Sequence, residues 1–501
     1  MRAEPQTRAT IARAVGGLLL IALAAGAVAA IVLALGLGGR EPLDLKVERI
    51  AREANEKARP AADPFAWRDS RREQFEVRAA LGSSHVIYAL SPGGVVASAK
   101  RTAAFRPRIE AAAARHGVDA DTLEAIVFLE SAGRPDVIAG PTPESASGLS
   151  QILPSTATDL LGMQVDLPRS IELTKRLAKA KSRAEADRLR AERAAIDERF
   201  DPDQALDGAA RYLQIAEQRF GVEDLAVVSY HMGIGNLETV LRDYANAPDD
   251  QPIAGLIAAD GLSYAQVYFD SSPAEHRKAY EMLSGFDDDS SEYLWKIEAS
   301  EQMLSLYRKD PGRLADTADL ATSKATLEEV FHPESKTDVY DDPDEIEDGI
   351  DNGELVPLPA DRKLGWIEDR DLGELADELD QSPQLYRAMR PEALATLSYM
   401  AALVRNLSGE SKPLRVTSAV RDRTYQDLLV TENSQATEEY SLHTTGWSFD
   451  IRRDYASDRQ AVAFQFVLDR LSSLALIDYA VEPGAIHVTV SGLGKQLLEG
   501  S

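Results

Sequence analysis

The chain has 501 residues, no cysteine and a formal net charge of −27, from 82 acidic and 55 basic side chains. This length predicts two or three domains, and the negative charge argues against a nucleic-acid partner, because phosphate binding needs clustered Lys and Arg. The lack of cysteine excludes disulfides, thiolate metal sites, a cysteine nucleophile and a lipid anchor attached to cysteine.

Residues 1–40 predict a membrane anchor. From Ala14 to Gly38 the chain is uncharged and apolar, which is long enough for a helix to cross a bilayer. Three arginines precede this run, so the positive-inside rule places the N-terminus in the cytoplasm and the catalytic part of the chain outside it. A signal peptide that is cleaved, leaving a secreted protein, is the alternative. The length of the apolar run favours a retained single-pass anchor.

Residues 41–100 are predicted to form a juxtamembrane spacer. A charged, helix-like piece runs from Leu45 to Arg59 and is followed by prolines. A second piece, Ser84–Leu90, is predicted to be a strand, because it ends at a Ser-Pro-Gly-Gly turn sequence.

From residue 101 the pattern becomes helical, and its second predicted helix ends in an acid. At helical spacing Glu130 lies on the same face as Leu123, Ile126 and Val127, and glycine and proline stop the helix after it. A carboxyl group buried on an apolar stripe has a raised pKa, which suits a general acid near neutral pH. A structural glutamate paired with an arginine remains the alternative.

Further motifs follow in a fixed order. They are Glu130-Ser131, Gly148-Leu-Ser-Gln151-Ile-Leu-Pro-Ser-Thr-Ala157, Asp201-Pro with Tyr212-Leu213, and Tyr230-His-Met-Gly-Ile-Gly235. Together they resemble the soluble lytic transglycosylases, whose α-helical fold is related to goose-type lysozyme. The resemblance implies peptidoglycan glycan strands as substrate, cleavage between N-acetylmuramic acid and N-acetylglucosamine, a 1,6-anhydro product, and no cofactor for this domain.

The resemblance also implies roles for particular residues. Glu130 matches the single catalytic glutamate, while Ser131, Gln151 and Tyr230 match positions that line the cleft and bind the sugar or orient the acid. Most glycosidases use two carboxylates, and no second acid is evident in the sequence near Glu130. One glutamate suffices if it acts first as acid and then as base toward the sugar's own 6-hydroxyl. The family's Tyr-Asn-Ala-Gly is Tyr-His-Met-Gly here, with His231 in place of asparagine.

The lysozyme-like domain is predicted to span residues 101–330, with a charged helical insertion at about 171–199. That insertion carries nine basic and six acidic residues with little apolar periodicity, which predicts a solvated helical arm. Residues 331–359 are acidic and contain proline, as expected of a linker.

Residues 360–501 have a different character, with alternating strands and helices. Ser441-Leu-His443-Thr-Thr-Gly-Trp-Ser-Phe-Asp450 resembles the zinc D,D-carboxypeptidase and L,D-endopeptidase family that includes vancomycin-resistance peptidases. The resemblance implies that His443, Asp450 and His487 bind Zn²⁺ and that Arg421 stabilises the developing oxyanion. Two histidines and one carboxylate with an open position suit a zinc ion that activates water.

One departure from this family concerns the general base. The family places an acid three residues before the last histidine, and that position is Gly484 here. Glu482 is the nearest acid, but along one strand residues 482 and 487 point to opposite faces unless the Pro-Gly turn bends the chain. An active peptidase, a zinc site without hydrolysis and a domain without zinc all remain open.

The predicted architecture is therefore multidomain: a transmembrane helix, a mainly α lysozyme-like domain and a C-terminal α+β zinc-peptidase-like domain. The predicted function is cleavage of peptidoglycan glycan strands, with a second domain that binds or hydrolyses stem peptides. The predicted partners are glycan strands, stem peptides and, through the N-terminal helix, the membrane. The alternatives are a non-catalytic peptidoglycan-binding scaffold and a hydrolytic lysozyme with a degenerate peptidase domain.

Overall fold

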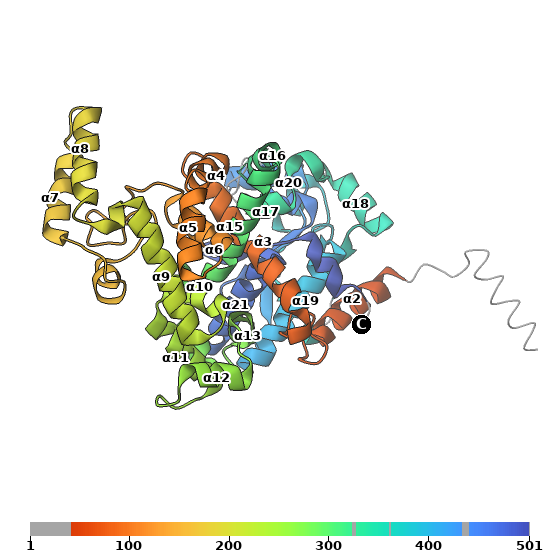
Figure 1. Ribbon diagram of the computed structural model, residues 1–501. Helices are drawn as coiled ribbons and strands as arrows, with labels where there is room; N and C mark the ends of the chain where they lie inside the picture. The colour runs from red at the N-terminus through yellow and green to blue at the C-terminus, as the bar shows by residue number, and fades with distance from the viewer. Residues whose placement is uncertain (1–41, 323–326, 360–361, 433–439, 500–501) are drawn as a thin grey trace, which may run out of the picture.

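The computed structural model describes residues 42–322, 327–359, 362–432 and 440–499. The predicted membrane anchor lies outside these residues. Among the helices that are described, none is both long and apolar enough to cross a membrane. The described chain is mostly helical with a sheet near its C-terminus (Figure 1), as the sequence predicted.

In the described residues before residue 101, all regular secondary structure is helical. Helices α2 (Leu43–Lys57), α3 (Arg72–Leu90) and α4 (Val95–Ala103) follow one another. The predicted strand at Ser84–Leu90 is wrong, because these residues continue α3, whose buried positions Phe75, Ala79, Ser83 and Ile87 recur every four residues. A seven-residue window was too short to show that periodicity.

This early segment packs on both later parts of the chain. Helix α3 lies against α15 (Tyr293–Lys309), and α2 lies against α19 (Pro391–Ser408). The Asn55 amide donates to the Leu364 carbonyl at 2.9 Å, and the Lys57 ammonium donates to the Leu497 carbonyl at 2.9 Å.

The central helices surround α6 (Ala120–Ser131), the helix that ends in Glu130 and Ser131. The Asp119 carboxylate caps its start by accepting from the backbone N–H groups of residues 121 and 122. Ala132, with φ of 53°, ends it in the left-handed conformation. The other helices of this part are α5 (Arg106–His116), α9 (Pro202–Phe220), α10 (Glu223–Met232), α11 (Ile234–Ala245), α12 (Ile253–Asp260), α13 (Tyr264–Asp270), α14 (Arg277–Leu283), α15 and α16 (Pro311–Thr322).

The charged insertion forms two helices, α7 (Leu167–Leu177) and α8 (Arg183–Ala194), which pack on each other and project from the central helices (Figure 1). Their base is anchored by ion pairs. The Arg193 guanidinium lies 2.7 Å from the Asp136 carboxylate, and the fully buried Arg199 pairs with Asp197 at 2.8 Å.

The C-terminal part is built on a five-stranded sheet with the order β2-β4-β5-β7-β6. Strands β2 and β4 are parallel and the other pairs are antiparallel. Apart from α19, the elements from residue 327 onward are α17 (Leu327–Phe331), α18 (Pro343–Asn352), β1 (Val356–Pro357), β2 (Trp366–Glu368), β3 (Ala388–Met389), β4 (Leu414–Ser418), α20 (Arg423–Glu432), β5 (Ser448–Arg452), α21 (Asp458–Ser473), β6 (Ile477–Val481) and β7 (Ala485–Val490).

The two faces of this sheet differ in character. Phe449, Ile451 and Val488 point to the face that α19 and α21 cover, and all three are fully buried. Residues of the opposite parity, among them Asp450 and His487, point to the other face.

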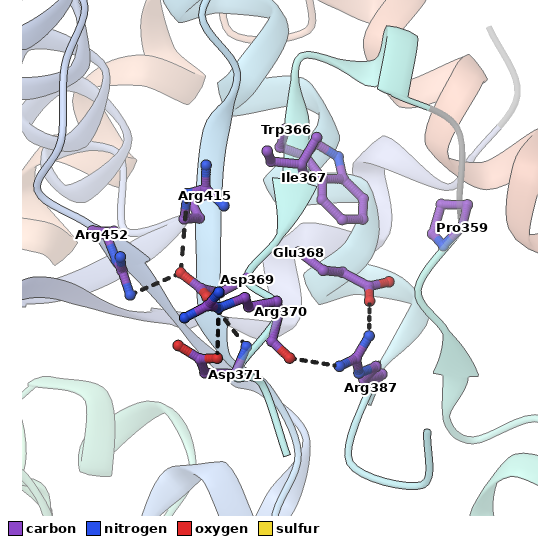
Figure 2. A pocket seen from close by; sticks show the side chains of 10 residues that line it. All are labelled: Pro359, Trp366, Ile367, Glu368, Asp369, Arg370, Asp371, Arg387, Arg415 and Arg452. Atoms are coloured by element: carbon purple, nitrogen blue, oxygen red, sulfur yellow. Dashed lines mark hydrogen bonds and ion pairs between the residues drawn. The ribbon is translucent and has the colours of Figure 1, made fainter. Parts of the chain in front are cut away.

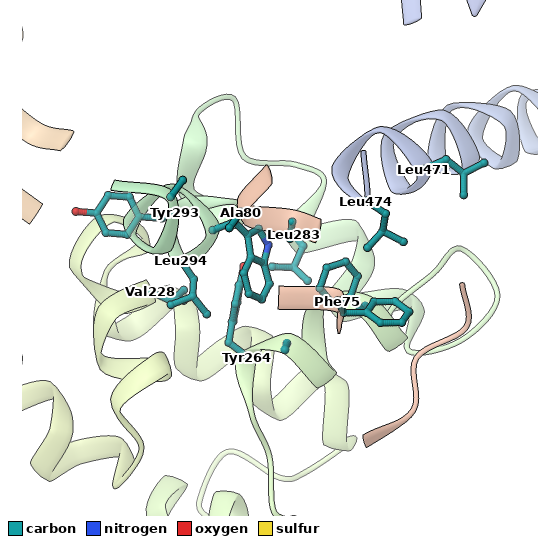
Figure 3. Packing of buried hydrophobic residues seen from close by; sticks show 14 of the residues in the cluster. Phe75, Ala80, Val228, Tyr264, Leu283, Tyr293, Leu294, Leu471 and Leu474 are labelled. Atoms are coloured by element: carbon teal, nitrogen blue, oxygen red, sulfur yellow. The ribbon is translucent and has the colours of Figure 1, made fainter. Parts of the chain in front are cut away.

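One hydrophobic core connects the central helices with the C-terminal part. Figure 3 shows Phe75 of α3 near Leu471 and Leu474 at the end of α21. The Arg470 guanidinium reinforces this junction by donating to the carbonyls of Tyr268 and Ser271 at 2.9 and 3.0 Å. The two parts are therefore packed firmly together.

Candidate functional site

The glutamate at the end of α6 lines a pocket. The cavity measures about 290 Å³ and lies between the ends of α3 and α6 and the start of α15. Val86, Ile87 and Leu90 of α3 form an apolar wall of it. The segment that precedes the central helices thus contributes to the surroundings of Glu130, which the sequence did not reveal.

The Glu130 carboxyl accepts one hydrogen bond from a side chain that the sequence analysis missed. The Tyr293 hydroxyl donates to Glu130 Oε1 at 2.7 Å. Burial raises the pKa of Glu130 to about 7; the Tyr293 hydrogen bond opposes this shift and the negative charge of Asp289 adds to it. A carboxyl group with this pKa is protonated in a large fraction of molecules at neutral pH.

A second acid lies in the same pocket, although none was evident in the sequence. Asp289 lines the cavity and pairs with the buried Lys296 ammonium at 2.5 Å. Its side chain is 62% exposed, so it is accessible from solvent. The sequence gives no spacing signal for Asp289 or Tyr293, because only the fold brings α15 and the turn before it to α6.

The aromatic side chains behind Glu130 form a stack. The ring of Tyr293 lies parallel to that of Tyr230 at 6.5 Å between centroids, and His231 stacks on Tyr293 at 5.0 Å. The Tyr230 hydroxyl donates to the Ser150 carbonyl at 2.7 Å, so Tyr230 connects α10 to the Gly-Leu-Ser-Gln loop. This places Tyr230 next to the side chain that holds Glu130.

Gln151 and Ser131 make local contacts. The Gln151 amide donates to the carbonyls of Val137 and Gly148 at 3.1 and 2.8 Å, which holds together the loop that follows α6. The Ser131 side chain is 1% exposed, and its hydroxyl donates to the Val127 carbonyl at 3.0 Å within α6. In this structure both side chains have positioning contacts, and their predicted binding of substrate stays a prediction.

A second cluster lies on the open face of the C-terminal sheet. His443 Nε2 is 3.1 Å and His487 Nδ1 is 2.8 Å from Asp450 Oδ1. One potential ligand atom from each of these three residues lies within 4.8 Å of the other two. Within the described part of the chain, this is the only group of His, Asp or Glu side chains that could hold a metal ion. Strands β5 and β7 pair antiparallel, and their register places Asp450 opposite His487.

The donor atoms of this cluster fit Zn²⁺. In the neutral tautomer with its proton on Nδ1, His443 donates a hydrogen bond to the Ala419 carbonyl at 2.8 Å. Its Nε2 atom, on the side of Asp450, is then unprotonated and able to bind a metal ion. The neighbouring imidazoles lower the pKa of Asp450 well below its ordinary value despite burial, so this group is an ionised carboxylate. Two imidazole nitrogens and one carboxylate leave one position of a tetrahedral zinc site open.

Glu328, from the short helix α17, was missed by sequence reasoning. Its Oε2 atom lies 3.1 Å from His487 Nε2 and accepts from the Thr489 hydroxyl at 2.9 Å. Burial disfavours the imidazolium form, but Asp450 and Glu328 raise the pKa of His487 to about 10. A carboxylate on the outer nitrogen of a metal-binding histidine orients the ring and increases its basicity.

Arg421 and Glu482 line the same cavity, of about 280 Å³, as the cluster. Arg421 Nη2 lies 3.5 Å from Asp450 Oδ2. Glu482 follows β6 and His487 lies on β7, so the turn at Pro483 and Gly484 bends the chain between them, which is the condition under which the sequence allowed both residues to reach one face. Ala480 pairs with His487, so Glu482, two residues beyond Ala480, lies on the same face of the sheet.

Comparison with known families addresses the central helices. A family model described as Transglycosylase SLT domain matches residues 107–174 and 177–252, which include Glu130, Ser131, Gln151 and Tyr230. The central part of the chain is therefore similar to a transglycosylase SLT domain. The match stops before α15, which supplies Tyr293, and it does not include the C-terminal sheet. The chain matches no curated protein.

Proposed function

We propose that this protein is an exported enzyme that cleaves peptidoglycan glycan strands by lytic transglycosylation, with Glu130 as the catalytic residue. The observation that carries the proposal is the Glu130 carboxyl itself, which lies half-buried in the part of the chain that matches the SLT model and accepts a hydrogen bond from the Tyr293 hydroxyl. Residues 1–40 are proposed to anchor the protein in the membrane, with the catalytic domains outside the cytoplasm.

The proposed reaction uses one carboxyl group twice. Because Oε1 accepts the Tyr293 hydrogen bond, the proton of the acid form is carried by Oε2, which is available to the substrate. This proton passes to the glycosidic oxygen as the bond to the sugar C1 breaks. The carboxylate then takes the proton of the sugar's 6-hydroxyl while O6 bonds to C1, which closes the anhydro ring and consumes no water.

Hydrolysis is the second candidate reaction, and Asp289 is the observation that favours it. Glycosidases that consume water commonly use a second carboxylate to activate it or to stabilise the cation. Asp289 lies in the Glu130 pocket, but its ion pair with Lys296 occupies one carboxylate oxygen. We therefore prefer the lytic reaction, in which no second carboxylate is required.

The acid role of Glu130 predicts a pH dependence. With a pKa of about 7, the protonated form is lost as the pH rises through 7, so the rate of glycan-strand cleavage should fall about tenfold per pH unit above that value. A glutamate with an ordinary pKa would already be deprotonated at pH 5.5. The rate of release of soluble fragments from purified peptidoglycan between pH 5 and 9 tests this, and an apparent pKa near 4.5 would contradict it.

For the C-terminal part we propose that His443, Asp450 and His487 hold Zn²⁺ and that this domain acts on stem peptides. The convergence of their donor atoms carries this proposal. When bound, the zinc ion would supply a Lewis acid and an activated water. Glu482 and Arg421 line the cavity as the proposed base and oxyanion-stabilising group, and Glu328 orients His487.

A further inference from the structure

A third cavity lies at the edge of the C-terminal sheet, at strand β2. It measures about 640 Å³, more than twice the Glu130 pocket at about 290 Å³. Figure 2 shows that the side chains of Arg415, Arg452, Arg387 and Arg370 gather around it. Four arginines around one cavity are unusual in a chain with a net charge of −27.

The four arginines are not equally engaged with the protein. Arg387 donates to Glu368 at 3.0 Å and to the Leu372 carbonyl, and Arg370 pairs with Asp371 at 3.0 Å. Arg415 and Arg452 share a single acid, Asp369. The cavity lining therefore carries one positive charge more than its three acids neutralise.

Arg415 and Arg452 retain free hydrogen-bonding capacity. Arg415 Nε lies 3.9 Å from Asp369 Oδ2, which is beyond hydrogen-bond distance. Arg452 Nη2 lies 2.8 Å from the same oxygen, yet that buried oxygen accepts no well-directed hydrogen bond within the described chain. The two side chains are 36% and 47% exposed, so their N–H groups can reach a ligand in the cavity.

The cavity lies on the same face of the sheet as the His443–Asp450–His487 cluster. Arg452 follows Asp450 by two residues on β5, so both side chains point to the open face, with Cα atoms about 7 Å apart. Arg415 lies on the neighbouring strand β4, which pairs with β5. An extended peptide that runs from the cluster toward the sheet edge would reach these arginines within two to three residues.

We propose that this cavity binds a carboxylate of the stem peptide, two to three residues from the bond placed at the His443–Asp450–His487 cluster. Guanidinium groups suit this ligand because their planar N–H forks match the geometry of a carboxylate. The inference rests on the proposed action of the C-terminal domain on stem peptides. It adds a binding site that would select acidic peptides.

The test compares two ligands and three proteins. The ligands are a synthetic stem pentapeptide with free carboxylates and the same peptide with every carboxylate amidated. The proteins are the full chain, its Arg415→Ala variant and its Arg459→Ala variant. Arg459 is an exposed arginine at the start of α21 that does not line the cavity. Binding is measured by calorimetry with a chelator present, so that the peptide stays intact.

The full chain should bind the free acid about tenfold more tightly than the amide, as expected for a charge-assisted hydrogen bond. Arg415→Ala should remove this preference and Arg459→Ala should keep it. Because the Arg415 side chain makes no hydrogen bond within the described residues and its ion pair with Asp369 spans 3.9 Å, Arg415→Ala should leave the melting temperature unchanged, which separates binding from folding. A preference that persists in Arg415→Ala would overturn this inference alone. Binding of neither peptide by the full chain would overturn the proposed action on stem peptides as well.

Discussion

Replacing Glu130 by glutamine is expected to lower the rate of glycan-strand cleavage by about 10³-fold or more. General acid catalysis alone contributes roughly 10²–10⁴-fold, and the amide can neither donate the first proton nor accept the second. The fold should be unaffected, because the glutamine carbonyl oxygen can still accept the hydrogen bond that the Tyr293 hydroxyl makes to Glu130. The measurement is release of soluble fragments from purified peptidoglycan by equal amounts of the two proteins.

The matched control is Glu298→Gln. Burial and two neighbouring glutamates raise the pKa of Glu298 to about 8, yet this residue on α15 does not line the Glu130 pocket. Glu298 therefore has a raised pKa, as Glu130 does, but lies outside the Glu130 pocket. Glu298→Gln should cleave peptidoglycan at the rate of the parent protein. Undiminished cleavage by Glu130→Gln would show that the acid is misassigned. A parent protein that binds peptidoglycan without cleaving it would favour the scaffold interpretation.

The second large effect concerns the metal. The full chain is expected to bind one zinc ion, and His443→Ala should abolish that binding, because two ligands remain of three. Glu328→Gln should weaken zinc binding by about 10–100-fold. It removes the carboxylate beside His487 Nε2 but leaves all three proposed zinc ligands in place. Zinc content after dialysis, and competition with a chromogenic chelator, measure both effects without any assay of activity.

His276→Ala is the control for these variants. His276 lies at the start of α14 in the central part of the chain, where its Nδ1 atom is 2.7 Å from the Tyr244 carbonyl oxygen. Its loss should leave the zinc content unchanged. A full chain that takes up no zinc after incubation with the ion would contradict the proposed metal site, and equal zinc content in the parent and His443→Ala would contradict the ligand assignment.

The sequence predicted those helices and strands that are determined by short stretches of residues. The Asp119 cap and the apolar stripe of α6 are contained in a dozen residues, so the helix and the place of Glu130 at its end could be expected. His443, Asp450 and His487 lie together on the sheet, and it was the resemblance to the zinc peptidases that had grouped them in the sequence.

Features that depend on long-range packing were not predictable in the same way. Tyr293 lies 163 residues after Glu130, and Glu328 lies 159 residues before His487, so no pattern links either pair. The orientation of Glu482 depends on the turn between β6 and β7, which Pro483-Gly484 allows but does not impose, so the sequence left this orientation open. The strand predicted at Ser84–Leu90 is instead the last part of α3, a helix that packs on α15 along its length and ends at Leu90, just before the turn.

The most direct test of the proposed function is mass analysis of the muropeptides released from purified peptidoglycan by the full chain. Lytic transglycosylation predicts fragments that end in 1,6-anhydro-N-acetylmuramic acid, one water lighter than the hydrolytic products, and their absence from the Glu130→Gln digest. Fragments that end in reducing N-acetylmuramic acid would contradict the lytic mechanism and identify the enzyme as a hydrolase, with Asp289 as the second carboxylate to examine.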